Sequence, residues 1–124
     1  MAKWLHLAVG GIAGTYARYT LAGVVYKVAG TAFPYGTLVV NLLGCAIIGF
    51  LATLAEEKFL LSPNARILLM AGFCGAFTTL STFMLETDRL AKDGQTIRAL
   101  LNVLATVGMG YLAFRVGEFL AHVL

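Results

Sequence analysis

The sequence predicts an all-α integral membrane protein with four transmembrane helices, the third of which is broken near its middle. Of its 124 residues, 60% are hydrophobic and 12% are charged, and the mean hydropathy is +0.86. Such a short chain cannot bury that much apolar surface in a water-soluble core, so the surface must face lipid. The nine lysines and arginines are scattered between apolar runs, and this spacing argues against nucleic-acid binding.

The third apolar segment predicts the break. Between Gly72 and Glu86 it combines glycines, threonines, a serine and a carboxylate, all of which weaken a lipid-facing helix. Irregular backbone is tolerated at membrane depth only where it is buried in protein or lines a wet cavity. A continuous helix over residues 65–92 would also measure about 42 Å, which exceeds a hydrocarbon core of about 30 Å. We therefore expect irregular backbone between Gly75 and Thr79.

Four membrane spans are expected in a single domain that covers residues 1–124. Their approximate ranges are 4–26, 34–55, 65–90 and 96–122. Gly10 and Gly14 form a GxxxG pattern that lets another helix approach the first span closely, and Gly108 and Gly110 offer a similar surface on the fourth. Arg18 interrupts the first span. It either extends toward the headgroups or attracts anions at the mouth of a pore.

Polar residues recur at helical spacing in two other spans. Thr37 and Asn41 lie four residues apart on one face of the second span, and Asn102 and Thr106 repeat this arrangement in the fourth. An isolated asparagine in a membrane commonly joins two helices, but it can also line a polar path. Glu86 allows two interpretations as well: it couples transport to protons, or it reaches water near the end of its span.

The distribution of cationic residues predicts the topology. Four spans place both termini and the link between the second and third spans on one side of the membrane. The cations are Lys3, Lys58, Arg66 and Arg115 on that side, and Lys27, Arg89, Lys92 and Arg98 on the other, with Arg18 nearest to the second group. Because an imbalance of lysine and arginine orients small membrane proteins, a near tie predicts insertion in both directions. Four short helices also cannot readily enclose a polar path, so we expect an antiparallel, dual-topology homodimer.

No catalytic constellation is visible, so we do not expect an enzyme. The sequence contains no nucleophile beside a histidine, no cluster of metal ligands and no phosphate-binding loop. Cys45 and Cys74 are expected to be small buried hydrophobic residues. The remaining polar groups are hydroxyls, amides, phenyl edges and the backbone of a broken helix, which can replace water around a small ion.

Three motifs resemble those of the Fluc (CrcB-type) fluoride channels. They are Gly75-Ala76-Phe77-Thr78-Thr79-Leu80-Ser81-Thr82-Phe83 followed by Glu86, Pro34-Tyr35-Gly36-Thr37-Leu38-Val39-Val40-Asn41, and Gly10-Gly11 leading to Arg18-Tyr19. The likeness covers essentially the whole chain. It implies dual-topology dimers of four-helix subunits, with two antiparallel pores that export cytoplasmic fluoride passively. It also implies a multi-pass protein of the plasma or inner membrane of a bacterial or archaeal type of cell.

The resemblance further implies roles for individual residues. The backbone carbonyls of Gly75 and Thr78, from both subunits, would bind one central structural sodium ion, and no organic cofactor is implied. Asn41 would contact fluoride with its side chain, and Phe83 would offer its ring edge, which carries the positive end of the aromatic quadrupole. The other residues implied along the fluoride path are Thr37, Leu80, Ser81, Thr82, Asn102, Thr106 and Arg18.

One departure from the family pattern leaves alternatives open. Most members have phenylalanine where this chain has Leu80, so the chain could instead be one half of a heterodimer. Phe77 lies one turn earlier and points in a different direction, so it is not expected to replace the missing ring.

Two rival functions are a small proton-coupled exporter and a structural membrane subunit. The exporter needs a carboxylate deep in the first span, where this chain has none.

Overall fold

The computed structural model describes all 124 residues and consists of helices joined by short links. The helices are α1 (Ala2–Ala29), α2 (Tyr35–Glu56), α3 (Pro63–Arg66), the π-helical segment η1 (Ile67–Cys74), α4 (Gly75–Phe77), α5 (Leu80–Lys92) and α6 (Thr96–His122). From α3 to α4 the chain is continuously helical, and with α5 these segments form one long, interrupted third helix. The helix ends lie within about three residues of the predicted ranges.

Three of the long helices have the length and composition of membrane spans. They are α2, the 30-residue third helix from Pro63 to Lys92, and α6. The first helix, α1, is 28 residues long and therefore long enough to cross a bilayer, but it is less apolar than the other three. Its crossing of the membrane remains a prediction, and Arg18 is its most conspicuous polar residue.

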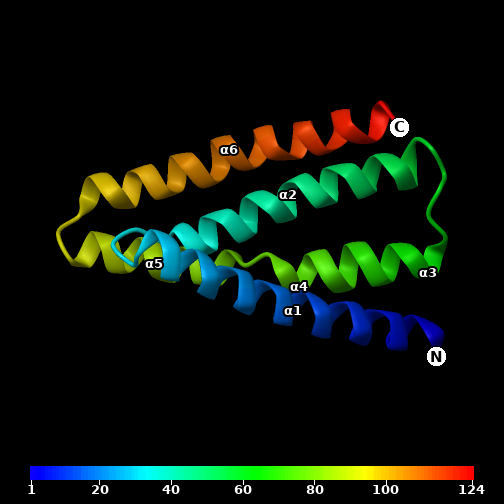
Figure 1. The fold of residues 1–124 in the computed structure, drawn as a ribbon, viewed down its shortest axis with the longest axis horizontal. Coiled ribbons are helices and arrows are strands. Elements are labelled where there is room, and N and C mark those ends of the chain that lie inside the picture. Colours follow the sequence, from blue (N-terminus) through cyan, green and yellow to red (C-terminus); the bar gives the residue numbers. More distant parts are fainter.

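The two ends of the molecule are distinct (Figure 1). Both termini and the link between α2 and α3 lie at one end, which we call the terminal end. The α1–α2 and α5–α6 links lie at the other, the loop end. This arrangement agrees with the predicted positions of the termini. The cations also divide between the ends: Lys58 donates to the carbonyl oxygen of Leu124 at the terminal end, and Arg98 donates to that of Ala32 at the loop end.

The α2–α6 pair packs through glycines. A side-chain carbon added to Gly49 would collide with the backbone of Phe114, and one added to Gly117 would collide with the backbone of Ala46 and Phe50. On α6 the close contact is therefore made by Gly117, and the prediction that Gly108 and Gly110 make it was wrong. Gly108 has open space around it, and a carbon on Gly110 would meet only the Cys45 sulfur, at 3.5 Å.

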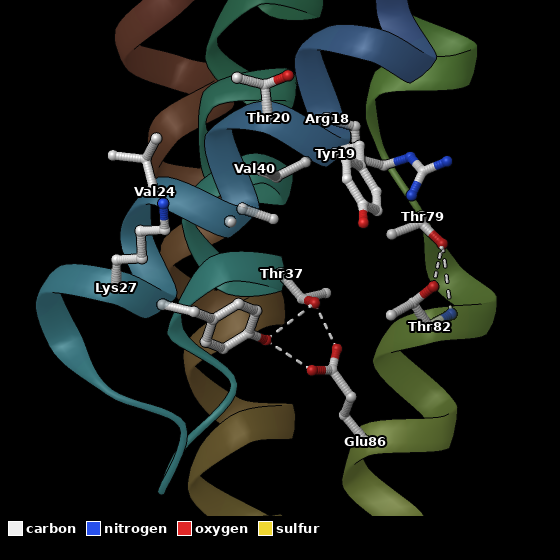
Figure 2. Close-up of a pocket in the computed structure, with 13 residues that line it drawn as sticks. Arg18, Tyr19, Thr20, Val24, Lys27, Thr37, Val40, Thr79, Thr82 and Glu86 are labelled. Atoms are coloured by element: carbon white, nitrogen blue, oxygen red, sulfur yellow. Dashed lines mark hydrogen bonds between the residues drawn. The ribbon is translucent and has the colours of Figure 1, made fainter.

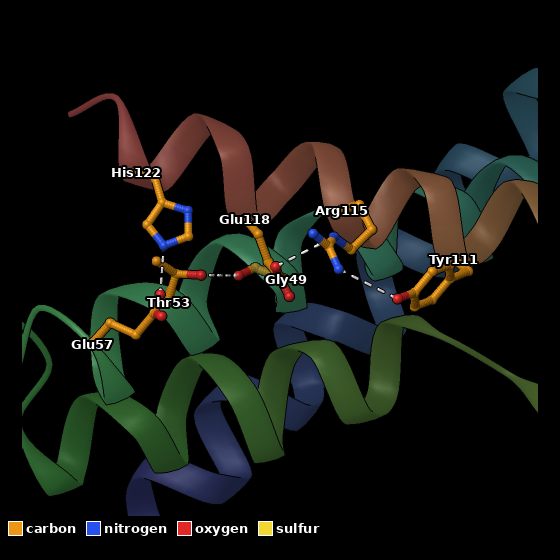
Figure 3. A network of polar contacts seen from close by, with 7 residues as sticks. All are labelled: Gly49, Thr53, Glu57, Tyr111, Arg115, Glu118 and His122. Carbon is orange, nitrogen blue, oxygen red and sulfur yellow. Dashed lines mark hydrogen bonds and ion pairs between the residues drawn. The ribbon is translucent and has the colours of Figure 1, made fainter.

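The same pair carries a polar network at the terminal end (Figure 3). The His122 ring lies 2.6 Å from the Glu57 carboxylate and links the ends of the two helices. Arg115 forms an ion pair with Glu118, one turn further along α6. The Thr53 hydroxyl donates a hydrogen bond to the carbonyl oxygen of Gly49. This network therefore links the ends of α2 and α6 that lie beside the C-terminus.

The predicted GxxxG of α1 packs against the third helix. A side chain on Gly10 would collide with the backbone around Leu68, and one on Gly14 would collide with the backbone of Phe73. Both glycines are buried. Thus α1 presses directly on η1 and α4, the segment that leads into the break.

The break itself is confirmed, but it is narrower than predicted. Gly75 is still helical, with φ −61° and ψ −33°, and only Thr78 and Thr79 leave the helix for extended backbone. The hydroxyls of these two threonines bond to helical backbone on either side of the break. Thr78 donates to the carbonyl of Cys74, and Thr79 accepts from the Thr82 amide as the N-cap of α5. The two threonines therefore end one half-helix and begin the next.

Candidate functional site

The buried amide of Asn41 closes the break from the side of α2. Its nitrogen donates to the Thr79 carbonyl at 3.2 Å, and its oxygen accepts from the Thr79 amide at 2.9 Å. This reciprocal pair satisfies both backbone groups of a residue that lies outside the helices. Asn41 thereby joins two helices, and it does so at the irregular backbone.

One cavity lies beside this pair, with a volume of about 440 Å³. We call it the Phe83 cavity. Its polar and aromatic lining includes Asn41, Thr78, Thr79, Phe83 and Thr106, and its apolar lining includes Leu80 and both cysteines. Phe83 is only 4% exposed, whereas Leu80 is 69% exposed at the open side. Three different helices and the break thus contribute to one small, mostly apolar space.

The fourth helix contributes two polar side chains of different character. Asn102 is 2% exposed and donates to the Thr87 hydroxyl at 2.9 Å, which in turn donates to the carbonyl of Phe83 at 2.7 Å. The Thr106 hydroxyl is buried and has no hydrogen-bond partner within the chain. Since Thr106 lines the Phe83 cavity, its unpaired hydroxyl is buried next to this space.

A second cavity of about 650 Å³ also has Thr79 in its lining (Figure 2). We call it the Arg18 cavity, and Lys27, Thr37, Thr82 and Glu86 also line it. Thr79 belongs to the lining of both cavities. The Asn41–Thr79 pair therefore stands where the two cavities meet.

Glu86 is held in the Arg18 cavity by two hydroxyls (Figure 2). Tyr26 donates to one carboxylate oxygen at 2.6 Å, and Thr37 donates to the other. The Tyr26 ring lies against Gly36, where a side-chain carbon would collide with it. A further cavity of about 440 Å³ at the loop end shares Tyr26 and Glu86 with the Arg18 cavity, so these two side chains lie between the two spaces.

Arg18 extends from α1 to the end of the first half-helix. Its Nε donates to the carbonyl of Ala76 at 3.0 Å, and its side chain is half-buried. The cationic side chain therefore contacts the backbone just before the break and also lines the Arg18 cavity.

Comparison with known proteins identifies the family. The family model described as CrcB-like protein, Camphor Resistance (CrcB), matches residues 5–118. The chain belongs to the CrcB family. A relative from Geobacter sulfurreducens is 49% identical over 109 residues, which are 88% of each chain, and one from Chlorobaculum tepidum is 46% identical over 121 residues, 98% of this chain and 95% of the relative. A third, from a Sulfurihydrogenibium species, is 42% identical over the full length of both chains. All three are named fluoride-specific ion channel FluC.

Membership in the CrcB family, together with the apolar helices, makes the chain a multi-pass membrane protein. The CrcB motif residues of the third helix are distributed around the break. Phe83 and Leu80 reach the Phe83 cavity, and Thr82 lines the Arg18 cavity. Ser81 is exposed and belongs to neither lining. Phe77 is buried and stacks on Phe73 with ring centroids 5.4 Å apart, and it does not belong to the lining of the Phe83 cavity.

Sequence reasoning missed three members of the site. Tyr26 ends the first predicted span, and the sequence contains no signal that its hydroxyl reaches Glu86, 60 positions away. Thr87 follows Glu86 and could have been found, since it lies four residues after Phe83 on the same helical face. Thr79 was placed in the break, but its pairing with Asn41 was not anticipated.

Proposed function

We propose that the chain is a fluoride-selective passive ion channel that lets fluoride leave the cytoplasm across the plasma or inner membrane. The observation that carries the proposal is the Phe83 cavity, where the Asn41 amide, the free Thr106 hydroxyl and the Phe83 ring meet beside broken backbone. The name shared by the relatives supports fluoride as the transported ion.

The chemistry of this cavity suits a small, strongly hydrated anion. Fluoride leaves water only where donors recover much of its hydration energy, and amide and hydroxyl groups can do so in an otherwise apolar space. The edge of the Phe83 ring adds a weak positive field. Arg18 and Lys27 line the neighbouring cavity and would attract the anion to it.

We propose that two antiparallel copies form the conducting unit. The balanced cations at the two ends support insertion in both orientations. The Phe83 cavity opens on the exposed side of Leu80, and α6 exposes a long apolar face, so one chain alone leaves the polar path incomplete. Tagging both ends and finding a single orientation in every molecule would contradict the dual topology. An unlike second subunit is the alternative, because Leu80 supplies no ring.

We also propose a structural sodium ion at the break. No hydrogen bond within the chain uses the carbonyl oxygens of Gly75 or Thr78, and hard cations prefer such oxygens. Gly75 is exposed, which leaves its carbonyl accessible to a second copy. When bound, the ion would neutralise the negative C-terminal end of the first half-helix in each copy.

The decisive test is fluoride efflux from loaded liposomes, measured with a fluoride electrode in the presence of a potassium ionophore. We expect electrogenic efflux with the wild-type chain and almost none with Phe83→Ile. Phe119→Ile is the matched control, because Phe119 is 63% exposed on α6 and lines neither cavity. Unchanged efflux with Phe83→Ile would remove this ring from the mechanism. If the wild-type chain conducts nothing, a missing partner subunit becomes the better account.

Glu86 supports a second candidate, a proton-coupled exporter. Its carboxylate is partly buried between two cavities, a position in which a proton could be exchanged. The same assay separates the two. A channel conducts down the fluoride gradient without a proton gradient, whereas coupled export requires one.

A further inference from the structure

Three residues on one face of α1 contact the third helix on the N-terminal side of the break. Gly10, Gly14 and Arg18 follow one another at intervals of four residues, so they share one helical face. The two glycines lie against the backbone of the third helix, and Gly14 would meet both Phe73 and Ala76 if it carried a side chain. Arg18 continues this contact by one turn, beyond the last residue of close backbone packing.

The Ala76 carbonyl lacks its helical partner. In an uninterrupted helix it would accept from the amide of Leu80, but Leu80 begins the second half-helix and makes no such bond. A carbonyl at the end of a helix also carries part of its negative dipole. The Nε of Arg18 donates to this oxygen at 3.0 Å, so a charged donor occupies the place of the lost amide.

We propose that Arg18 is a positioning residue whose donor fixes the end of α4. The Ala76 carbonyl lies between Gly75 and Thr78, whose own carbonyls are free, and just before Thr79, which Asn41 holds. Holding Ala76 therefore keeps this whole turn in register with α1 and α2. This role is separate from attraction of anions by the charge of Arg18, and its effect on transport rests on the proposed function.

Two substitutions separate the donor from the charge. Arg18→Gln places an amide nitrogen at the same bond distance from Cα as Nε and removes the charge. Arg18→Met has similar length but offers neither donor nor charge. Lys27→Met is the matched control, because it removes a charge from the same cavity without a contact to the break.

The native thiol of Cys74 reports on the break without any need for transport. Cys74 is 4% exposed, and its carbonyl accepts both the amide and the hydroxyl of Thr78. Cys45→Ser leaves it as the only thiol, and its labelling by N-ethylmaleimide is followed by intact-protein mass spectrometry. We expect Arg18→Met to label several-fold faster than the parent, and Arg18→Gln and Lys27→Met to label at the parental rate.

Fluoride efflux gives the second readout. If the donor positions the break, Arg18→Gln retains part of the efflux and rescues what Arg18→Met loses. Equal efflux and equal labelling for the Gln and Met variants would overturn the proposal and leave the charge as the whole role of Arg18.

If the Met variant does not fold, the Gln variant decides alone: labelling as fast as in Asn41→Ala overturns the proposal, and labelling at the parental rate supports it. Because labelling does not require conduction, a chain that fails to transport fluoride still tests the role of Arg18.

Discussion

The α2–α6 pair and the pair formed by α1 and the third helix both pack through glycines, but only the second pair borders the break. In both pairs, glycines bring the two backbones into direct contact. Both α2 and α6 are unbroken, and their polar network lies at the terminal end. The third helix is interrupted, and polar groups from α1 and α2 meet it in the middle of the protein. The comparison shows that close packing alone does not produce a site. The site appears where side chains replace missing backbone hydrogen bonds.

The largest effect is expected when a side chain is added to a glycine at the contact between the two unbroken helices, α2 and α6. We expect Gly117→Leu to yield no monodisperse protein after purification, because its side chain would displace the backbone of α2 near Ala46. Size-exclusion chromatography in detergent measures this effect. Gly108→Leu is the control, since nothing lies within 4 Å of a side-chain carbon at that position. Equal yields of both variants would mean that the α2–α6 contact is not required for folding.

The next largest effect is expected at the break. Asn41→Ala leaves the amide and the carbonyl of Thr79 without their side-chain partners, and each unsatisfied buried group costs about 1–3 kcal/mol. We expect a lower thermal midpoint and fluoride efflux close to that of empty vesicles. Asn64→Ala provides the control, since Asn64 lies exposed in α3. A stable, conducting Asn41→Ala variant would show that the break holds its shape without α2.

The comparison also explains how far the sequence alone predicts this protein. The helices follow from long apolar runs, and the break follows from threonines and glycine at membrane depth, since local composition determines both. The extent of the break was overestimated because Gly75 is tolerated within the helix. A glycine permits irregular backbone but does not require it.

Contacts between distant helices were the least predictable part. Asn41 was identified as a polar member of α2, but its partner depends on where the third helix ends its first half. The close-packing glycines of α6 were placed two turns too early, because GxxxG-like spacing does not tell which face meets another helix. The triad around Glu86 requires the spatial arrangement of three helices, which no local pattern specifies.

A smaller effect is expected at that triad. Tyr26→Phe keeps the ring beside Gly36 and removes the hydrogen bond to Glu86, which contributes about 1–2 kcal/mol. The carboxylate then has one donor instead of two and can move further into the Arg18 cavity, where it repels an entering anion more strongly. We therefore expect fluoride efflux to fall by about 3–10-fold. Tyr16→Phe is the control, because Tyr16 is 72% exposed on α1. Identical efflux for both variants would exclude Tyr26 from the path.

The smallest effect is expected at Leu80, the exposed apolar wall of the Phe83 cavity. Leu80→Phe adds a ring whose edge can face an anion, and because the position is 69% exposed within one chain, the larger side chain fits without displacing its neighbours. In a homodimer we expect efflux to be retained or to rise a few-fold. Leu85→Phe is the control on the same helix, since Leu85 lines neither cavity. A large loss of efflux with Leu80→Phe alone would mean that leucine is matched to a neighbouring surface, and an unlike partner subunit would then be the simpler explanation for its presence.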